Sequence, residues 1–149
     1  MSKTPLEIAQ QLRPALSRLY LLYFRQAETF SISQAQMSIM TILDETGPMR
    51  ISQIAQAEAI RMPTASNAVN QLESMGLVSR VRDVSDRRGV SVQLTEKGKE
   101  ELIRSGENRN VALARMIENL TPEEIAQVEK AAPLINLILN RYTEAHSKD

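Results

Sequence analysis

An arginine-rich stretch at residues 80–95 offers the clearest chemistry in this chain. On or beside its predicted turn it carries four arginines: Arg80, Arg82, Arg87 and Arg88. A guanidinium group binds phosphate oxygens and guanine edges through two parallel hydrogen bonds. Asp86 lies beside the last two arginines, where a charge-assisted hydrogen bond could hold one guanidinium in a fixed direction. An arginine at a hairpin tip fits the narrow, electronegative minor groove of duplex DNA.

Two predicted strands, at residues 77–82 and 90–94, position these arginines, and the residues between them are typical of a turn. From Val90 to Leu94, apolar residues alternate with polar ones such as Ser91, which predicts one buried and one exposed face. The stretch therefore predicts a hairpin that carries its charges at its outer end.

Immediately before the hairpin, the sequence predicts two helices joined by a very short turn, at residues 53–60 and 63–75. Ser52 is predicted to cap the first helix, with the small Ala59 among the inward-facing residues that let the two helices approach closely. Gly76 is expected to end the second helix in a left-handed conformation. This pattern is typical of a helix-turn-helix.

The outward face of the second helix carries neutral hydrogen-bonding side chains and no carboxylate in its first two turns. Asn and Gln amides can bond adenine with two hydrogen bonds, and Thr can contact a thymine methyl group. The predicted DNA-contacting residues, on this helix and on the hairpin, are Arg61, Pro63, Thr64, Ser66, Asn67, Asn70, Gln71, Arg80, Arg82, Asp86, Arg87 and Arg88. Taken singly, the helix fits a solvated polar face equally well, and the hairpin fits an ordinary charged turn. A short extended stretch is also predicted at residues 49–51, before the helix pair. A strand, a helix pair and a basic hairpin in that order favour a winged helix that binds duplex DNA.

This arrangement resembles the multiple antibiotic resistance regulator (MarR) family of winged helix-turn-helix transcriptional regulators, over nearly the whole chain. The sharpest likeness is D-R-R-G-V-S-V-Q-L-T at residues 86–95, followed by E-K-G, while L-E-S-M-G-L-V at residues 72–78 is similar to the family's passage from recognition helix to wing. The resemblance identifies Arg88 with the family's minor-groove arginine and Asp86 with the acid that orients it. Met62 and Pro63 depart from the small hydroxylated residues usual there.

The resemblance implies a mainly α fold with a small β-hairpin wing, namely a winged helix-turn-helix plus a helical dimerisation region formed by both termini. We expect an N-terminal dimerisation helix and linker at residues 1–32. A DNA-binding domain follows at residues 33–98, with the recognition helix at about 63–75 and the wing at about 78–94. Residues 99–149 are expected to form a long helix and a C-terminal dimerisation helix.

Both terminal segments are more apolar than a surface helix of a monomer requires. The residues predicted to form a dimer interface are Leu16, Leu19, Tyr23, Leu134, Ile138 and Tyr142. The resemblance implies a homodimer in which these terminal helices interdigitate and two recognition helices lie about 34–36 Å apart on an inverted repeat of DNA. The alternative is a monomeric helical bundle.

Four of the five aromatic residues lie between Tyr20 and Phe30, and Met37 and Met40 follow on the next predicted helix. Methionines and aromatics form adaptable apolar pockets. Residues expected to bind a small aromatic or amphipathic effector are Arg18, Tyr20, Phe24, Met37 and Met40. Ordinary core and dimer packing is the alternative.

Composition excludes several classes of protein. The chain contains no cysteine, and its single histidine, His146, lies near the C-terminus, so thiol chemistry and a zinc site are not expected. We find no nucleophile–base pair or phosphate loop, and expect neither an enzyme nor a cofactor. The N-terminus lacks the apolar region of a signal peptide, so a cytoplasmic location is expected.

The net charge of zero hides an uneven distribution, because residues 61–94 carry five basic and three acidic side chains. The expected function is a homodimeric DNA-binding transcriptional regulator, specifically a repressor that a small-molecule ligand releases from an inverted-repeat operator. The alternative, which the zero net charge motivates, is a winged-helix protein-interaction module without sequence-specific DNA binding.

Overall fold

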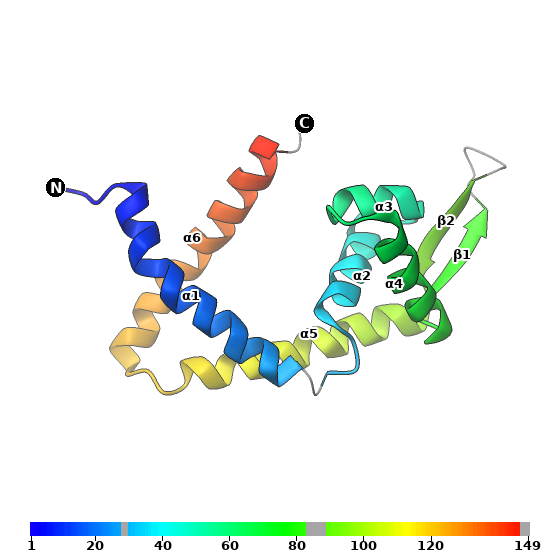
Figure 1. Cartoon of the computed structure of the whole chain (residues 1–149). Coiled ribbons are helices and arrows are strands. Elements are labelled where there is room, and N and C mark those ends of the chain that lie inside the picture. The colour runs from blue at the N-terminus through cyan, green and yellow to red at the C-terminus, as the bar shows by residue number, and fades with distance from the viewer. Residues whose placement is uncertain (28–29, 83–88, 147–149) are drawn as a thin grey trace. The chain divides into compact units, whose positions relative to one another are not determined.

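The computed structural model describes residues 1–27, 30–82 and 89–146. These residues form six helices and one antiparallel hairpin (Figure 1). In chain order the elements are α1 (Pro5–Ala27), α2 (Gln34–Thr46), α3 (Ile51–Ala57), α4 (Met62–Ser74), β1 (Val78–Arg82), β2 (Val90–Leu94), α5 (Glu96–Ile117) and α6 (Pro122–His146). The predicted mainly helical fold with a single hairpin is confirmed. None of the helices in the described part of the chain is long and apolar enough to cross a membrane.

The chain divides into two compact units, residues 1–112 and 113–149. The first unit contains α1 to α4, the hairpin and most of α5. The second contains the last turn of α5 and all of α6.

Three helices begin at a Ser or Thr residue that has a Glu or Gln three positions later, which is the sequence pattern of a capping box. Ser33 Oγ accepts a hydrogen bond from Gln36 N at 3.1 Å, and Gln36 Oε1 accepts one from Ser33 N at 3.0 Å. The same reciprocal pair joins Thr4 to Glu7 at the start of α1 and Thr121 to Glu124 at the start of α6. These hydrogen bonds satisfy amide groups that a helix start leaves unpaired. At α1 they hold the pKa of the Glu7 carboxyl below its usual range.

The core of the first unit lies where α2, α3, α4 and β2 meet. Its most deeply buried side chains come from all four elements and include Ile39, Met40, Ile54, Val69, Leu72 and Val92. The apolar spacing on α4 places Ala65, Val69 and Leu72 inward. Burial of this face fixes which side of α4 points outward.

The third helix begins earlier than predicted. Its N-cap is Arg50 rather than Ser52, and it ends at Ala57, so Ala59 lies beyond it with a φ of 53°. The cause is tertiary: Met49 and Val92 exchange backbone hydrogen bonds of 3.0 and 2.7 Å, which hold the chain extended just before Arg50. The side chain of Gln53 then accepts a hydrogen bond from Arg50 N at 2.9 Å.

The hairpin pairs Arg80 with Val92 and Arg82 with Val90. The predicted alternation in β2 is wrong at its outer half, since Val90 is 49% exposed while Ser91 is buried. Val90 is the first residue of β2, and the outer end of this strand extends away from the helices of the first unit (Figure 1). Further in, β2 has backbone partners on both edges, β1 and Met49, and the short serine side chain is shielded there.

Candidate nucleic-acid interface

The outward face of α4 is polar and has no charged residue before Glu73, in the last turn, as predicted. Opposite its buried stripe it exposes Pro63, Thr64, Asn67, Asn70 and Gln71, while Ser66 is half-buried. Its first turn contains no acidic residue, and Arg61, at the N-cap, is exposed. A helix with such a face can approach the phosphates of DNA without charge repulsion and offers hydrogen bonds to base edges.

Two residues of this face are held by neighbouring elements. The amide oxygen of Asn70 accepts a hydrogen bond of 2.7 Å from Arg80 Nη2 on β1. The amide oxygen of Gln71 accepts one of 3.0 Å from Gln36 Nε2 on α2. Within the described part of the chain, the side chain of Asn67 makes no hydrogen bond. Its amide group is therefore free to rotate, whereas those of Asn70 and Gln71 are held in one orientation.

Arg80 points toward α4 rather than away from the domain. Its Nε lies 3.3 Å from Glu73 Oε2, in addition to its bond to Asn70. Both members of this ion pair are more than one third exposed, so the pair contributes little to stability. Its consequence is geometric, because it ties the first strand of the hairpin to the second half of α4.

The tip of the hairpin lies outside the described residues, and with it Asp86, Arg87 and Arg88. Arg82, on the strand, is exposed. Sequence reasoning missed Arg50, whose guanidinium packs against the start of β2. A Cβ at Gly89 would lie 2.8 Å from Arg50 Nη2. The extended pattern around Met49 was visible in the sequence, but the pairing with Val92 that brings Arg50 to the hairpin was not.

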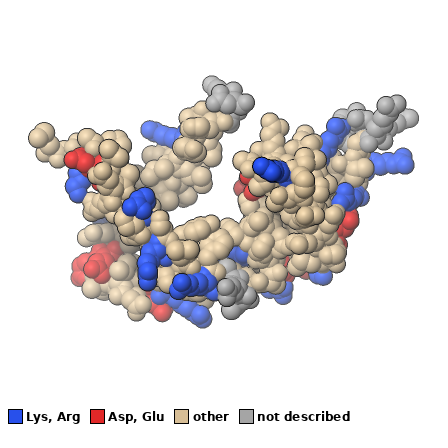
Figure 2. Space-filling view, viewed as in Figure 1, with Lys and Arg blue, Asp and Glu red and all other residues tan. Residues whose placement is uncertain are grey.

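Basic side chains gather around the hairpin and α4 in the first unit. Figure 2 shows basic side chains at the hairpin, where the sequence has arginines and no lysine, with few acidic side chains beside them on that face. Exposed arginines there include Arg61, Arg80 and Arg82. The arrangement supplies positive charge next to the neutral face of α4, which suits a polyanion.

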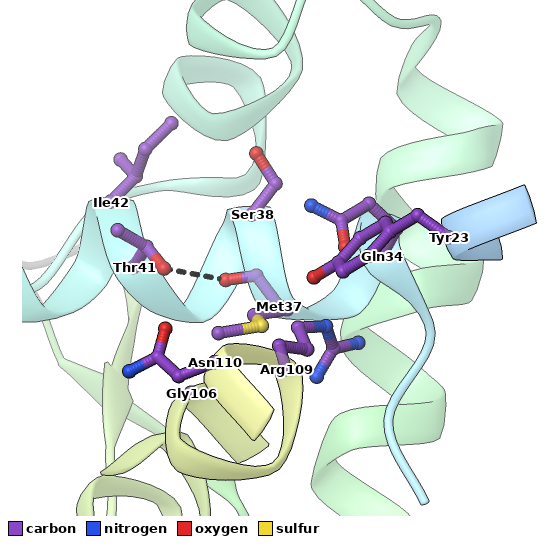
Figure 3. Close-up of a pocket in the computed structure, with 9 residues that line it drawn as sticks. All are labelled: Tyr23, Gln34, Met37, Ser38, Thr41, Ile42, Gly106, Arg109 and Asn110. Carbon is purple, nitrogen blue, oxygen red and sulfur yellow. Dashed lines mark hydrogen bonds between the residues drawn. The ribbon is translucent and has the colours of Figure 1, made fainter. Parts of the chain in front are cut away.

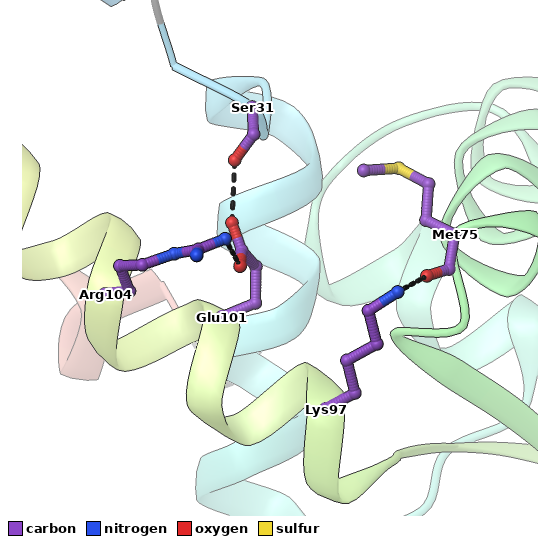
Figure 4. Close-up of polar contacts among 5 residues, drawn as sticks. All are labelled: Ser31, Met75, Lys97, Glu101 and Arg104. Atoms are coloured by element: carbon purple, nitrogen blue, oxygen red, sulfur yellow. Dashed lines mark hydrogen bonds and ion pairs between the residues drawn. The ribbon is translucent and has the colours of Figure 1, made fainter.

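The start of α5 fastens the junction between α4 and the hairpin. Lys97 Nζ donates a 2.9 Å hydrogen bond to the carbonyl oxygen of Met75, which follows α4 (Figure 4). Thr95 Oγ1 donates one of 2.6 Å to the carbonyl of Gly76, whose φ of 75° confirms the predicted left-handed helix end. These bonds fix the direction in which the hairpin leaves α4.

A pocket of about 410 Å³ lies between α1, α2 and α5 (Figure 3). Its lining residues are Tyr23, Gln34, Met37, Ser38, Thr41, Ile42, Gly106, Arg109 and Asn110. Among the residues predicted to bind an effector, only Met37 lines it. Met40 is completely buried in the core, Arg18 and Tyr20 are exposed, and Phe24 packs against Tyr20 with ring centroids 4.4 Å apart.

Arg109 gives this pocket a buried cation. The side chain is 5% exposed, donates a 2.8 Å hydrogen bond to Ile32 O, and lies 4.6 Å from the centroid of the Phe30 ring. Its Nε has no hydrogen-bond partner among the described residues. The sequence predicts a positive charge from Arg18 on α1 instead, because helical spacing alone gives no sign that α5 turns an arginine toward α2.

The residues predicted to form a dimer interface are mostly exposed in the single chain. Leu16 and Leu19 on α1 are 56% and 50% exposed. On α6, which has no buried residue, Leu134, Ile138 and Tyr142 are 59 to 68% exposed. Tyr23 is half-buried and belongs to the pocket.

Comparisons with known proteins agree with these features. Residues 32–90 match the model of the MarR family. The uncharacterized HTH-type transcriptional regulator YfiV of Bacillus subtilis (strain 168) is 31% identical over 108 residues, which cover 72% of this chain and 68% of YfiV. The HTH-type transcriptional repressor MdtR of the same organism is 28% identical over 102 residues, covering 67% of this chain and 64% of MdtR.

The fold is likewise similar to that of solved winged-helix structures. A MarR family protein from Bacillus stearothermophilus has a TM-score of 0.69 with this chain at 24% identity, over 91% of this chain and 94% of that protein. Members of this family are transcriptional regulators and not enzymes. The match to the family model, the identity with YfiV and the shared fold together establish that this chain belongs to the MarR family.

Proposed function

We propose that this protein is a homodimeric, DNA-binding transcriptional repressor that binds an inverted-repeat operator and is released by a small-molecule effector. The observation that carries DNA binding is the exposed, neutral, hydrogen-bonding face of α4, flanked by arginines of the hairpin. In this proposal α4 enters the major groove, and the hairpin, with Asp86, Arg87 and Arg88 at its tip, reaches the adjacent minor groove. Such a regulator acts where the chromosome is, so the proposal places it in the cytoplasm.

The homodimer is supported by the apolar side chains that α1 and α6 leave exposed. Large apolar residues such as Leu19 and Ile138 lie in water when the chain is alone. Contiguous apolar surface of this kind marks a protein interface. A second copy of the chain is the occupant we propose, with residues 1–32 and 99–149 as dimerisation segments and residues 33–98 as the DNA-binding domain.

A two-fold dimer presents two copies of α4 to one face of DNA. Two recognition helices bind half-sites whose centres are about 10–10.5 base pairs apart, or a multiple of that spacing. The operator in this proposal is therefore an inverted repeat.

Effector release is supported by the pocket between α1, α2 and α5. The buried guanidinium of Arg109 lies beside the thioether of Met37 and the ring of Tyr23, so a cation and apolar surface line one cavity. A small aromatic acid matches both features. Because α1 belongs to the proposed dimerisation region and α2 to the DNA-binding domain, an occupant could alter the spacing of the two copies of α4.

A gel shift of the full chain against DNA upstream of its own coding sequence tests the proposal, read at low and high salt. Binding by a dimer, weakened by salt and competed poorly by unrelated duplexes, is expected. A folded dimer that binds no duplex at low salt would instead identify a protein-interaction module.

A further inference from the structure

We propose that hydrogen bonds within the protein make the amides of Asn70 and Gln71 donors toward DNA, so that the second half of α4 selects groups that accept hydrogen bonds. The inference rests on the proposed binding of α4 to DNA. Arg80 and Gln36 act here as positioning residues, because they determine which end of each amide faces outward.

The orientation of Asn70 follows from the chemistry of arginine. Arg80 Nη2 lies 2.7 Å from Asn70 Oδ1, and a guanidinium group has donors only. The amide oxygen of Asn70 must therefore face Arg80, which Glu73 holds in place through a contact of 3.3 Å. The NH₂ group of Asn70, an exposed residue, is left for an external partner.

The orientation of Gln71 follows from the start of α2. Gln36 Oε1 accepts a hydrogen bond from Ser33 N at 3.0 Å, as part of the reciprocal cap of that helix. The other end of the same amide, Nε2, therefore points away from Ser33 and donates to Gln71 Oε1 at 3.0 Å. The NH₂ group of Gln71 is again left outward.

Reading adenine with two hydrogen bonds requires one donor and one acceptor on the same amide. The oxygens of Asn70 and Gln71 face Arg80 and Gln36, so it is the NH₂ groups that face outward. The positive charge of Arg80 further disfavours an amino group beside Asn70. The acceptors available in the major groove are N7 and O6 of guanine, O4 of thymine and N7 of adenine, and the phosphate oxygens lie outside it. Adenine N7 lies beside an amino group that is itself a donor, so an outward NH₂ group favours guanine and thymine. Asn67, one turn earlier on the same face, has both ends of its amide free of hydrogen bonds to the described residues, so it remains suited to adenine.

Selection from a random duplex library by the full-length protein and matched variants tests the inference. Asn70→Ala and Gln71→Ala locate the base pair that each amide contacts. Arg80→Met keeps the apolar part of the side chain but removes its hydrogen-bond donors. Arg80→Lys keeps a positively charged donor group. Gln36→Glu still accepts from Ser33 N, so the cap of α2 is retained, but its second oxygen forces Gln71 to turn its NH₂ group inward.

If the acceptor is a base edge, the wild type prefers guanine or thymine by about tenfold at the base pairs that Asn70 and Gln71 contact, called here the Asn70 and Gln71 positions. Arg80→Met then shifts the Asn70 position toward adenine, while Arg80→Lys keeps the wild-type preference. Gln36→Glu shifts the Gln71 position toward adenine or cytosine, the bases with amino groups. If the acceptor is a phosphate, Asn70→Ala and Arg80→Met weaken binding to all duplexes by the same factor and leave base preferences unchanged.

A wild-type preference for adenine at the Asn70 position would overturn the inference, as would an Asn70→Ala variant with unchanged affinity and preference. Thermal unfolding of each variant confirms that it is folded. Failure of the wild type to bind any duplex would overturn the proposed function itself, and with it this inference. If the wild type binds DNA but neither Arg80→Met nor Gln36→Glu changes the affinity or the base preference, only the inference is overturned.

Discussion

A Cβ atom built on Gly98 would lie 2.0 Å from the carbonyl oxygen of Leu77, far inside van der Waals contact. Leu77 links α4 to β1, and Gly98 is in the first turn of α5. The backbone at Leu77, just before the hairpin, therefore packs directly against the backbone at the start of α5. Only glycine at position 98 allows this close approach. Thr95 N donates a 3.1 Å hydrogen bond to the same carbonyl oxygen.

Gly98→Ala should destabilise the protein, because the clashing atom is backbone and the two segments must move apart. We expect the free energy of unfolding to fall by about 1–3 kcal/mol or more, measured by denaturant titration at one protein concentration. Gly106→Ala is the matched control on the same helix. Its added Cβ meets only Met37 Cε at 3.8 Å, and removing a helical glycine raises stability by up to about 1 kcal/mol. Equal effects of the two variants would contradict the packing described here.

The hydrogen bond between Glu101, on α5, and Ser31, just before α2, should stabilise the protein. This buried carboxylate accepts a hydrogen bond of 2.6 Å from Ser31 Oγ and pairs with Arg104 (Figure 4). Hydrogen bonds to charged groups contribute about 1.5–3 kcal/mol, so Glu101→Ala should cost that much and Ser31→Ala less. In a double-mutant cycle, a coupling energy above about 0.5 kcal/mol is expected. Additive effects of the two substitutions would show that the contact contributes nothing.

Sequence patterns within a few residues predict most of the fold. The features that they do not predict depend on pairing between segments far apart in the sequence. The caps at Thr4, Ser33 and Thr121 were predictable because each depends on a side chain three residues away. The start of α3 was not, because the hydrogen bonds between Met49 and Val92 join segments that lie far apart in the sequence. For the candidate site, the polar face of α4 followed from helical spacing. The engagement of Asn70 by Arg80 depends on how β1 leaves α4, which spacing does not specify.

Ile138→Asp should convert the dimer to a monomer, because it places a charge in the apolar surface that a second copy is proposed to cover. Ile138 is 68% exposed in the single chain, so the substitution leaves that chain folded. Sedimentation at micromolar concentration should give twice the chain mass for the wild type and one chain mass for the variant. Val90→Asp, an equally drastic change at an exposed apolar residue of the hairpin, is the control and should remain dimeric. If the mass of Ile138→Asp were unchanged, the segment around Ile138 would not be part of the dimer interface.

Benzoate should stabilise the protein by occupying the pocket beside Arg109, whereas the neutral analogue benzamide should not. At a hundredfold excess over its dissociation constant, a ligand adds about 2.7 kcal/mol to the stability, which thermal unfolding detects. Gly106→Leu fills the pocket and should abolish the shift. Equal responses to benzoate and benzamide, or a shift that persists in Gly106→Leu, would exclude this cavity as an anion site.

Arg88→Ala should weaken binding to all duplexes by a similar factor, because the predicted contact of Arg88 is with the minor groove and its phosphates. The slope of log affinity against log salt should flatten by about one unit if one phosphate contact is lost. Lys130→Ala, on α6, is the control and should leave the slope unchanged. An unaltered slope for Arg88→Ala would mean that the wing does not contact DNA through this residue.

Two copies of α4 are proposed to bind one DNA site. The symmetry of the sequence that the full-length protein selects from random duplexes tests this arrangement. We predict an inverted repeat with half-site centres about 10–10.5 base pairs apart or a multiple of that spacing, bound by two chains per duplex. Selection of a single unrepeated site, bound by one chain, would rule out this arrangement.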